Sequence, residues 1–213
     1  MKEIDLLDNL LERYPALEPC RSDILGVFSM LSESFASGRK LLLAGNGGSA
    51  ADAEHIVGEM MKSFVFPKAL PEGYADELVR IDPGMGAELA SMLQGALPAI
   101  ALDGHTALST AYMNDCEPRF VFAQQVNGYG RPGDVFLGIS TSGNSRNVLY
   151  AAVAAKARGM KVAALTGAAS AEIDRFADVC IHVPETETYK VQELHLPVYH
   201  CLCLMLEVHF FGK

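Results

Sequence analysis

The chain reads AGNGGSAADAEHIVGE over residues 44–59, a glycine-rich turn that leads into a helical pattern. The apolar run before the turn predicts a buried strand over residues 40–45. Gly47 and Gly48 allow the backbone to reverse and to approach a ligand closely, and Ser49 stands where the N-cap of the helix is expected. Free N–H groups at a helix start attract anions. The stretch therefore predicts either an anion site or a plain strand-to-helix turn.

A second strand, turn and helix follow one another in GDVFLGISTSGNSRNVLYAAVAAKARG, residues 133–159. Four hydroxyl side chains fall within six positions of this turn: Ser140, Thr141, Ser142 and Ser145. Each can donate a hydrogen bond to a phosphate oxygen, and an ordinary turn rarely holds so many. We therefore expect an anion site here. Neither turn matches the dinucleotide-binding pattern or the P-loop with its lysine, so neither of those ligands is indicated.

The composition predicts one domain spanning residues 1–213, since the chain has 213 residues and is 50% hydrophobic. A net charge of −9 argues against nucleic acid and anionic membranes as partners, so we expect a small partner. The acidic N-terminal helical pattern lacks signal-peptide features, and no apolar run of membrane-spanning length is expected, which predicts a cytoplasmic protein. The five cysteines contain no C-x-x-C pair, so we expect buried, reduced thiols and no thiolate zinc site.

Helical and strand patterns alternate along the chain. Two N-terminal helices are expected at residues 2–14 and 21–37, and a long helix at about 188–211. Apolar strands are expected at residues 40–45, 98–103, 134–140, 161–166 and 179–184. This order predicts an α/β three-layer sandwich, in which helices flank a five-stranded parallel sheet and ligands bind beyond the carboxyl ends of the strands.

Residues 62–97 interrupt the alternation. Their prolines, glycines and mixed charges predict an insertion with little regular structure apart from a short helix at about 86–94. Because the insertion leaves the helix that carries Glu59, we expect it to cover the active site or a neighbouring subunit.

His55 and Glu59 are four residues apart, so both project from one face of a helix. That spacing suits a divalent metal ion or a base beside a substrate, although such a pair is more often a solvated surface. The C-terminal helix adds polar groups among apolar neighbours, and these need partners if they are buried: Gln192, Glu193, His195 and His200.

The motifs taken together resemble the sugar isomerase (SIS) domain: a strand followed by GNGGS, MND at 113–115, the GDVFLGISTSGNS block and the QELHLPVYH helix. More narrowly, they resemble phosphoheptose isomerases, which interconvert sedoheptulose 7-phosphate and glycero-manno-heptose 7-phosphate. The resemblance covers almost the whole chain except the insertion. It implies a flavodoxin- or Rossmann-like SIS fold, one zinc ion per subunit, and a homotetramer with active sites at subunit contacts.

The resemblance also implies roles for individual residues. The sugar phosphate would be bound by Asn46, Gly47, Gly48, Ser49, Asn114, Asp115, Ser140, Thr141, Ser142, Ser145 and Gln192. Zinc would be held by His55, Glu59, Gln192 and His200. Isomerisation moves a proton between adjacent carbons through an enediol, so Glu59 is the candidate base and His200 the candidate proton shuttle. A carboxylate bound to zinc is a poorer base, which leaves the division of roles for Glu59 open.

Gln192 and His200 are eight residues apart, about 12 Å along a straight helix. We therefore expect either a kink near Pro197 or one ligand from a neighbouring chain, and we favour a site completed at a subunit interface.

One sequence feature differs from the family pattern. The residues after the glutamate are Lys62-Ser63-Phe64 where a Gly-Arg-aromatic triplet is common, so the positive charge there is shifted or absent.

The alternative function is a non-catalytic SIS module that binds a sugar phosphate or serves as a tetrameric adaptor for a protein partner. His200 favours catalysis, because adaptor-type relatives typically have asparagine at that position. An amino-sugar isomerase or etherase is less favoured, because those lack this zinc constellation.

Overall fold

The computed structural model describes residues 2–212 and contains one parallel sheet with the strand order β2-β1-β3-β4-β5. The strands are β1 Leu41–Ala44, β2 Ala99–Ala101, β3 Val135–Ile139, β4 Lys161–Thr166 and β5 Val179–His182. Each lies within its predicted range, so the five-stranded parallel sheet is confirmed. The order changes direction between β1 and β3, and ligands of such sheets bind beyond the strands at that point.

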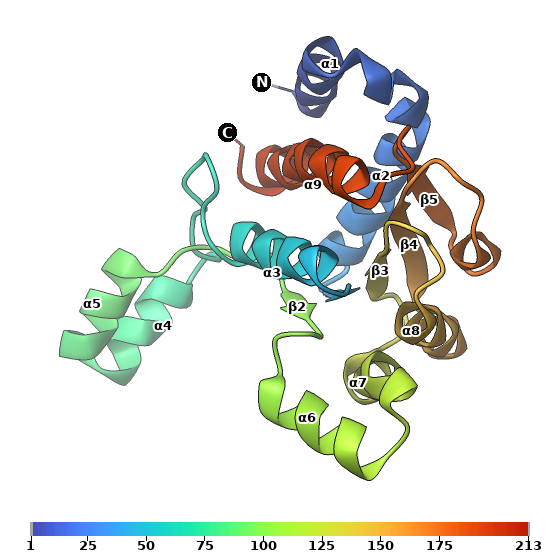
Figure 1. Cartoon of the computed structure of the whole chain (residues 1–213). Helices are drawn as coiled ribbons and strands as arrows, with labels where there is room; N and C mark the ends of the chain where they lie inside the picture. The colour runs from blue at the N-terminus through green and yellow to red at the C-terminus, as the bar shows by residue number, and fades with distance from the viewer. Residues whose placement is uncertain (1, 213) are drawn as a thin grey trace.

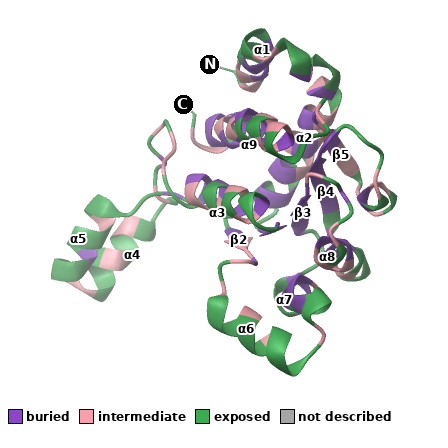
Figure 2. Ribbon diagram, in the orientation of Figure 1, coloured by how far each residue is buried: buried purple, intermediate pink, exposed green. Residues whose placement is uncertain are grey.

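Helices cover both faces of this sheet, which explains why β1 and β3 are buried along their whole length (Figures 1 and 2). Leu41 and Leu43 face one core, together with α2, α3 and α9, whereas Leu42 and Ala44 face the other, together with α7 and α8. The helices on the side of Leu41 and Leu43 are α2 Arg21–Ala36, α3 Gly48–Met61 and α9 Thr188–Phe211, with α1 Glu3–Arg13 packed on them. The helices on the side of Leu42 and Ala44 are α7 Val121–Tyr129 and α8 Arg146–Ala157, with α6 Thr106–Asp115 beside them. Short 3-10 helices are η1 Pro15–Cys20, η2 Pro118–Phe120 and η3 Glu172–Arg175.

The insertion is more regular than its composition predicts, since it folds into a pair of helices, α4 Tyr74–Ile81 and α5 Pro83–Met92. Asp82 caps α5 by accepting hydrogen bonds from the N–H groups of Gly84 and Met85 at 2.9 and 2.8 Å. Gly86 allows close packing, because a Cβ there would clash with the Leu78 carbonyl. The glycines and proline that suggested a loop are therefore helix-start and helix-contact residues.

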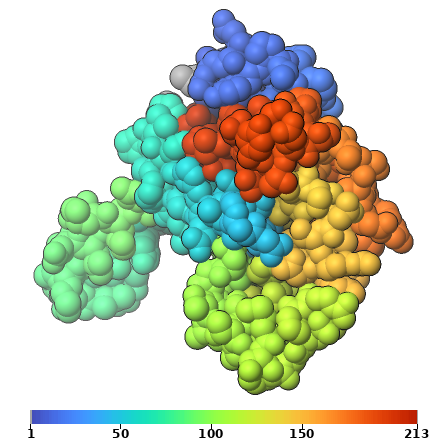
Figure 3. Space-filling model, viewed as in Figure 1, coloured from blue at the N-terminus to red at the C-terminus, as the bar shows by residue number. Residues whose placement is uncertain are grey.

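The α4–α5 pair projects away from the rest of the molecule (Figures 1 and 3). Its surface is apolar in part, with exposed side chains at Val79, Ile81, Met85, Leu89 and Met92. Apolar residues gathered on a projecting element are typical of a contact surface.

Helix α9 runs through Pro197 and matches the predicted bounds. Contrary to the expectation from the sequence, it is long and apolar enough to span a membrane, with a mean hydropathy of 1.3 over its most apolar window. Half of that window is buried inside the fold, and α9 packs against α1, α2 and α3. These contacts are those of a central core helix.

The cysteines are all free thiols. Cys20, Cys201 and Cys203 are buried as expected, but Cys180 is only half-buried and Cys116 is exposed. Burial raises the pKa of Cys20 to about 11, so this thiol is protonated at neutral pH.

His195 is a fully buried residue of α9, and neither of its ring nitrogens has a hydrogen-bond partner among the residues that the structure describes. Burial lowers its pKa from 6.5 to about 4, because the charged ring would lose its hydration. Between about pH 4 and pH 6.5, His195 is therefore protonated in the unfolded chain and neutral in the folded chain.

We predict that the protein loses stability as the pH falls from about 6.5 to about 4, with His195 contributing about 3 kcal/mol to the loss. Urea unfolding at several pH values measures this. His195→Leu should flatten the pH dependence, whereas His209→Gln, at a surface histidine beside Glu3, serves as the matched control. Equal pH dependence in the wild type and in His195→Leu would contradict the assignment.

Candidate active site

The glycine turn between β1 and α3 begins the site. Gly47 has a φ of +57°, which favours glycine, and α3 starts directly after it at Gly48. Ser49 is therefore not the N-cap that the sequence suggests; it is the second residue of the helix, and it is buried. The turn leaves Asn46 and Gly47 exposed beyond the carboxyl end of β1.

Gly48 is the residue of this turn that contacts α9. A Cβ at this position would lie 2.4 Å from the Nε2 atom of Gln192, so any larger residue would displace the glutamine side chain. The contact brings one predicted site residue of α9 to the start of α3.

The hydroxyl loop, residues 140–145, follows β3. Ser140 is buried, and its Oγ lies 3.0 Å from the Oγ of Ser145. Gly143 has a φ of +64° and donates from its N–H to the Ser140 carbonyl at 3.0 Å. Ser142 accepts from the N–H of Asn144 at 3.2 Å, and Thr141 is half-buried. The four predicted hydroxyl residues thus share one tight turn at the start of α8.

A residue that the sequence interpretation missed joins the two turns. Asn147 and Asn46 exchange two side-chain hydrogen bonds, at 3.0 and 2.8 Å. Both residues line a pocket of about 260 Å³ together with Gly47 and Met113. The pocket lies beyond the carboxyl end of β1, the side of a parallel sheet on which ligands bind.

Asn114 and Asp115 are exposed at the end of α6. The Asn114 amide donates to the Asp115 carboxylate at 2.8 Å. Their neighbour Met113 reaches the pocket between the turns. The structure therefore brings α6 to the edge of the pocket, with these two polar side chains bonded to each other.

A histidine–carboxylate cluster lies farther along α3, formed by His55, Glu59 and His200. His55 Nε2 lies 3.2 Å from Glu59 Oε1 and 3.5 Å from His200 Nε2. Tyr199, which the sequence interpretation also missed, fixes the other side of the ring, since its hydroxyl lies 3.0 Å from His55 Nδ1. The structure thus brings together three of the four predicted metal ligands, while Gln192 lies at Gly48.

Burial favours the neutral forms of several groups around this cluster. It lowers the pKa of His200, with a further lowering from neighbouring His55. It raises the pKa of Asp52, which lies one turn before His55, and that of the Tyr199 phenol. A neutral imidazole at His200 can accept a proton or bind a metal ion.

The cluster has the donor types of a zinc site, and its two measured separations suit ligands that share one ion with bonds of about 2 Å. The candidate ligand atoms of its three residues do not all lie within 4.8 Å of one another, however. Among residues 2–212, one group of three such side chains has all its candidate ligand atoms within 4.8 Å of one another: Asp174, Cys180 and His182. That group includes the thiol of Cys180.

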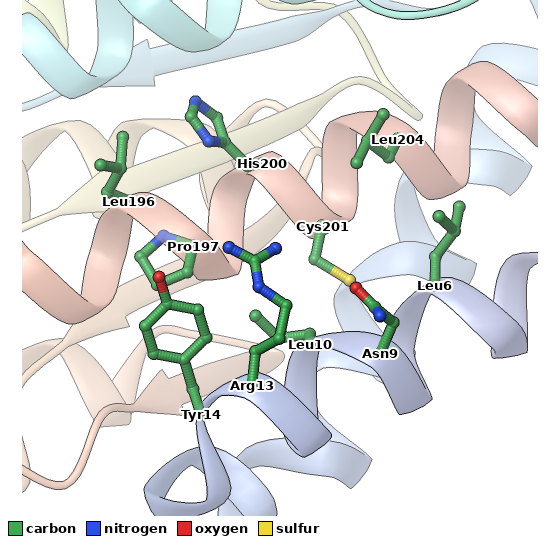
Figure 4. Close-up of a pocket in the computed structure, with 10 residues that line it drawn as sticks. All are labelled: Leu6, Asn9, Leu10, Arg13, Tyr14, Leu196, Pro197, His200, Cys201 and Leu204. Atoms are coloured by element: carbon green, nitrogen blue, oxygen red, sulfur yellow. The ribbon is translucent and has the colours of Figure 1, made fainter.

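A second pocket, of about 230 Å³, lies between α1 and α9, with His200 at its edge (Figure 4). Arg13 of α1 lines it opposite Pro197 and Cys201 of α9. In Figure 4 the ring of His200 points away from Arg13 and Tyr14, so of the histidine–carboxylate cluster only His200 borders this pocket.

The positive charge after Glu59 is supplied by Lys62, whose Nζ lies 3.1 Å from Glu59 Oε2. Phe64 follows, and its ring packs on His200 with 5.3 Å between the ring centroids. The Lys62-Ser63-Phe64 triplet thus contacts both proposed catalytic residues.

Lys68 and Glu207 hold the base of the insertion. Glu207 is buried and accepts hydrogen bonds from the N–H groups of residues 64–66 at 2.7 to 3.1 Å. Buried Lys68 donates to the carbonyls of Glu59, Met60 and Lys62 at the end of α3, and its Nζ lies 3.7 Å from Glu207. The pair therefore fixes the end of α3 and the position of Phe64.

We predict that Lys68→Met destabilises the protein by about 3 kcal/mol, because it leaves Glu207 buried without a cation and the end of α3 without donors. Denaturant unfolding measures this. Lys190→Met removes a half-buried lysine of a surface ion pair and should cost less than about 1 kcal/mol. Equal effects of the two substitutions would show that the buried pair does not hold the insertion.

Comparison with known proteins gives consistent similarities. Residues 85–167, which include the hydroxyl loop but not the glycine turn, match the family model described as SIS domain. The phosphoheptose isomerase of Aneurinibacillus thermoaerophilus is 38% identical over 84% of this chain and 77% of its own length. That of Thiobacillus denitrificans is 44% identical over 82% of this chain and 77% of its own length.

Solved structures agree with the sequence comparisons. A phosphoheptose isomerase from Francisella tularensis superimposes with a TM-score of 0.75 at 28% identity, over 97% of this chain and 98% of that chain. One from Neisseria gonorrhoeae gives 0.71 at 33% identity, over 96% and 92%. The similarity thus extends over nearly the whole chain in both cases.

Proposed function

The chain belongs to the phosphoheptose isomerase family, and from this we propose that it interconverts sedoheptulose 7-phosphate and glycero-manno-heptose 7-phosphate. The observation that carries the proposal is the contact of His200 with His55, which in turn contacts Glu59. A sugar-phosphate-binding module or an adaptor needs the two turns but not this cluster. The cluster therefore favours the isomerase over the non-catalytic alternative.

Phosphate recognition would rest on the hydroxyl loop. The chain carries a net charge of −9, which repels anions, so oriented local donors must compensate. Ser140 and Ser145 already hold each other at 3.0 Å, and the start of α8 adds free N–H groups beside them. This pre-organisation supports binding of the phosphate at residues 140–145, with the sugar toward Asn46, Gly47 and Gly48.

We predict that replacing both Ser140 and Ser145 by alanine weakens binding of sedoheptulose 7-phosphate about tenfold or more, as expected for losing about 1.5 kcal/mol of charge-assisted hydrogen bonds. Calorimetric titration measures the affinity, and circular dichroism checks the fold. Ser91→Ala, on the projecting α5, is the control. Unchanged affinity in the double variant would contradict the assignment of residues 140–145 as the phosphate loop.

Proton transfer would use Glu59 and His200. Glu59 is mostly buried, and its two oxygens have different partners, His55 at Oε1 and Lys62 at Oε2. We assign Glu59 as the base that moves the proton between adjacent carbons and His200 as the group that exchanges protons with the sugar oxygens. Zinc held by His55, Glu59, Gln192 and His200 would polarise those oxygens when bound. Coordination to zinc would lower the basicity of the Glu59 carboxylate, so the two roles of this residue compete.

The active site would be completed by a neighbouring subunit. Within one chain Gln192 lies at Gly48, whereas His200 lies at His55, seven residues farther along α3. Gln192 of one chain therefore does not join its own His200 around one ion, and we assign this ligand to a second subunit. The exposed apolar face of α4 and α5 supports a contact with another copy. A homotetramer with one zinc ion in the active site of each subunit is the assembly that we propose.

We also propose that residues 1–213 form a single SIS domain that carries residues 62–97 as an insertion. The free cysteines fit a reducing compartment, which supports action in the cytoplasm.

We predict that His200→Asn lowers turnover of sedoheptulose 7-phosphate at least about 100-fold, because asparagine keeps the polarity but cannot exchange a proton near neutral pH. Folding and sugar-phosphate binding should be retained. Aldose formation by the zinc-supplied protein is the measurement, and His209→Asn is the control at an exposed histidine of the same helix. Wild-type turnover in His200→Asn, or no turnover by the wild type, would favour the adaptor instead.

A further inference from the structure

We propose that Asp174, Cys180 and His182 form a second metal site, for zinc or a similar borderline cation, separate from the histidine–carboxylate cluster. Cys180 and His182 are two residues apart on β5, so both side chains project from the same face of the strand. Asp174 comes from η3, and the three candidate ligand atoms all lie within 4.8 Å of one another.

The ring of His182 is oriented for binding at Nε2. Its Nδ1 lies 3.0 Å from the carbonyl oxygen of Gly167 and 3.0 Å from the hydroxyl of Thr166. A carbonyl only accepts, so Nδ1 carries the hydrogen, and in the neutral ring the lone pair is on Nε2. Metal-binding histidines are typically held in this way through the nitrogen that does not bind the ion.

The carboxylate of Asp174 is likewise held through one oxygen, which leaves the other oxygen free to bind the ion. Its Oδ2 accepts from the N–H of Ala171 at 2.8 Å and from the hydroxyl of Ser170 at 3.2 Å. Its Oδ1 is buried and has no hydrogen-bond partner in the described chain, although it lies 3.3 Å from Nε2 of His182. That contact falls outside hydrogen-bond geometry, as expected for two ligands that flank one ion.

The donor set selects the class of metal. A thiolate, an imidazole and a carboxylate suit zinc and its neighbours, whereas magnesium and calcium prefer oxygen donors alone. Three protein ligands leave the fourth position of a tetrahedral ion to water. Binding would release the proton of the Cys180 thiol.

The site lies directly behind the hydroxyl loop. Ile173 and Glu172 of η3 donate from their N–H groups to Gly143 and to the side chain of Asn144, at 3.2 and 3.0 Å. Gly167, whose carbonyl holds His182, donates to the carbonyl of Thr141 at 3.1 Å. An ion that joins η3 to β5 would therefore make the support of this loop more rigid.

Cobalt(II) titration of the chelator-treated full-length chain tests the proposal. A thiolate bound to cobalt(II) gives a charge-transfer absorption in the near ultraviolet, and the histidine–carboxylate cluster contains no sulfur. We expect this band to appear, to saturate at one equivalent at this site and to be displaced by zinc. It should vanish in Cys180→Ser and remain in Cys116→Ser, which changes an exposed cysteine, and in the double variant His55→Ala/His200→Asn.

Three outcomes would overturn the site. Absence of the band in the wild type would show that Asp174 and His182 form only an ion pair, and its persistence in Cys180→Ser would assign it to another thiol. Thermal unfolding supplies an independent measurement: zinc should raise the Tm of His55→Ala/His200→Asn, and adding Asp174→Asn should remove that rise. A rise that is unchanged by Asp174→Asn would also contradict the proposal.

Discussion

The packing of α3 against α9 is the contact on which the candidate active site depends. It buries Ile56 and Met60 of α3 with Val198 and Tyr199 of α9 in the larger core. The same contact sets His55 against Tyr199 and His200. Apolar packing between two helices thus positions these polar groups, and sites carried by helices are held more precisely than sites on loops.

The ends of this helix pair are held by different means. At the start, Gly48 has no side chain and admits Gln192, which couples the glycine turn to α9. At the end, Lys68 and Glu207 form a buried pair that binds the last carbonyls of α3 and the backbone of residues 64–66. The insertion therefore begins with an ordered connection to the site, even though its helices project from the fold.

The sheet and the long α9 could be predicted from the sequence, because continuous apolar runs and helical periodicity are local signals. Helix α4 was missed and α5 was predicted only in part, as a short helix at about 86–94, because the residues of DPGMG that cap and pack these helices resemble loop residues. Asn147, Tyr199 and Glu207 were missed for another reason: their roles come from partners more than 100 residues away in sequence. The group at Asp174 was missed because its spacing matches no common metal motif.

Activity of mixed oligomers tests most directly whether one chain supplies His55 and His200 while another supplies Gln192. Co-expressed His55→Ala and Gln192→Ala chains, each inactive alone, should regain heptose phosphate isomerisation, because mixed assemblies contain sites with His55 from one chain and Gln192 from the other. Co-expressed His55→Ala and His200→Asn chains should stay inactive, because every site then lacks one histidine. Recovery in the second pair, or none in the first, would contradict a site built on the α3–α9 contact of one chain and completed by its neighbour.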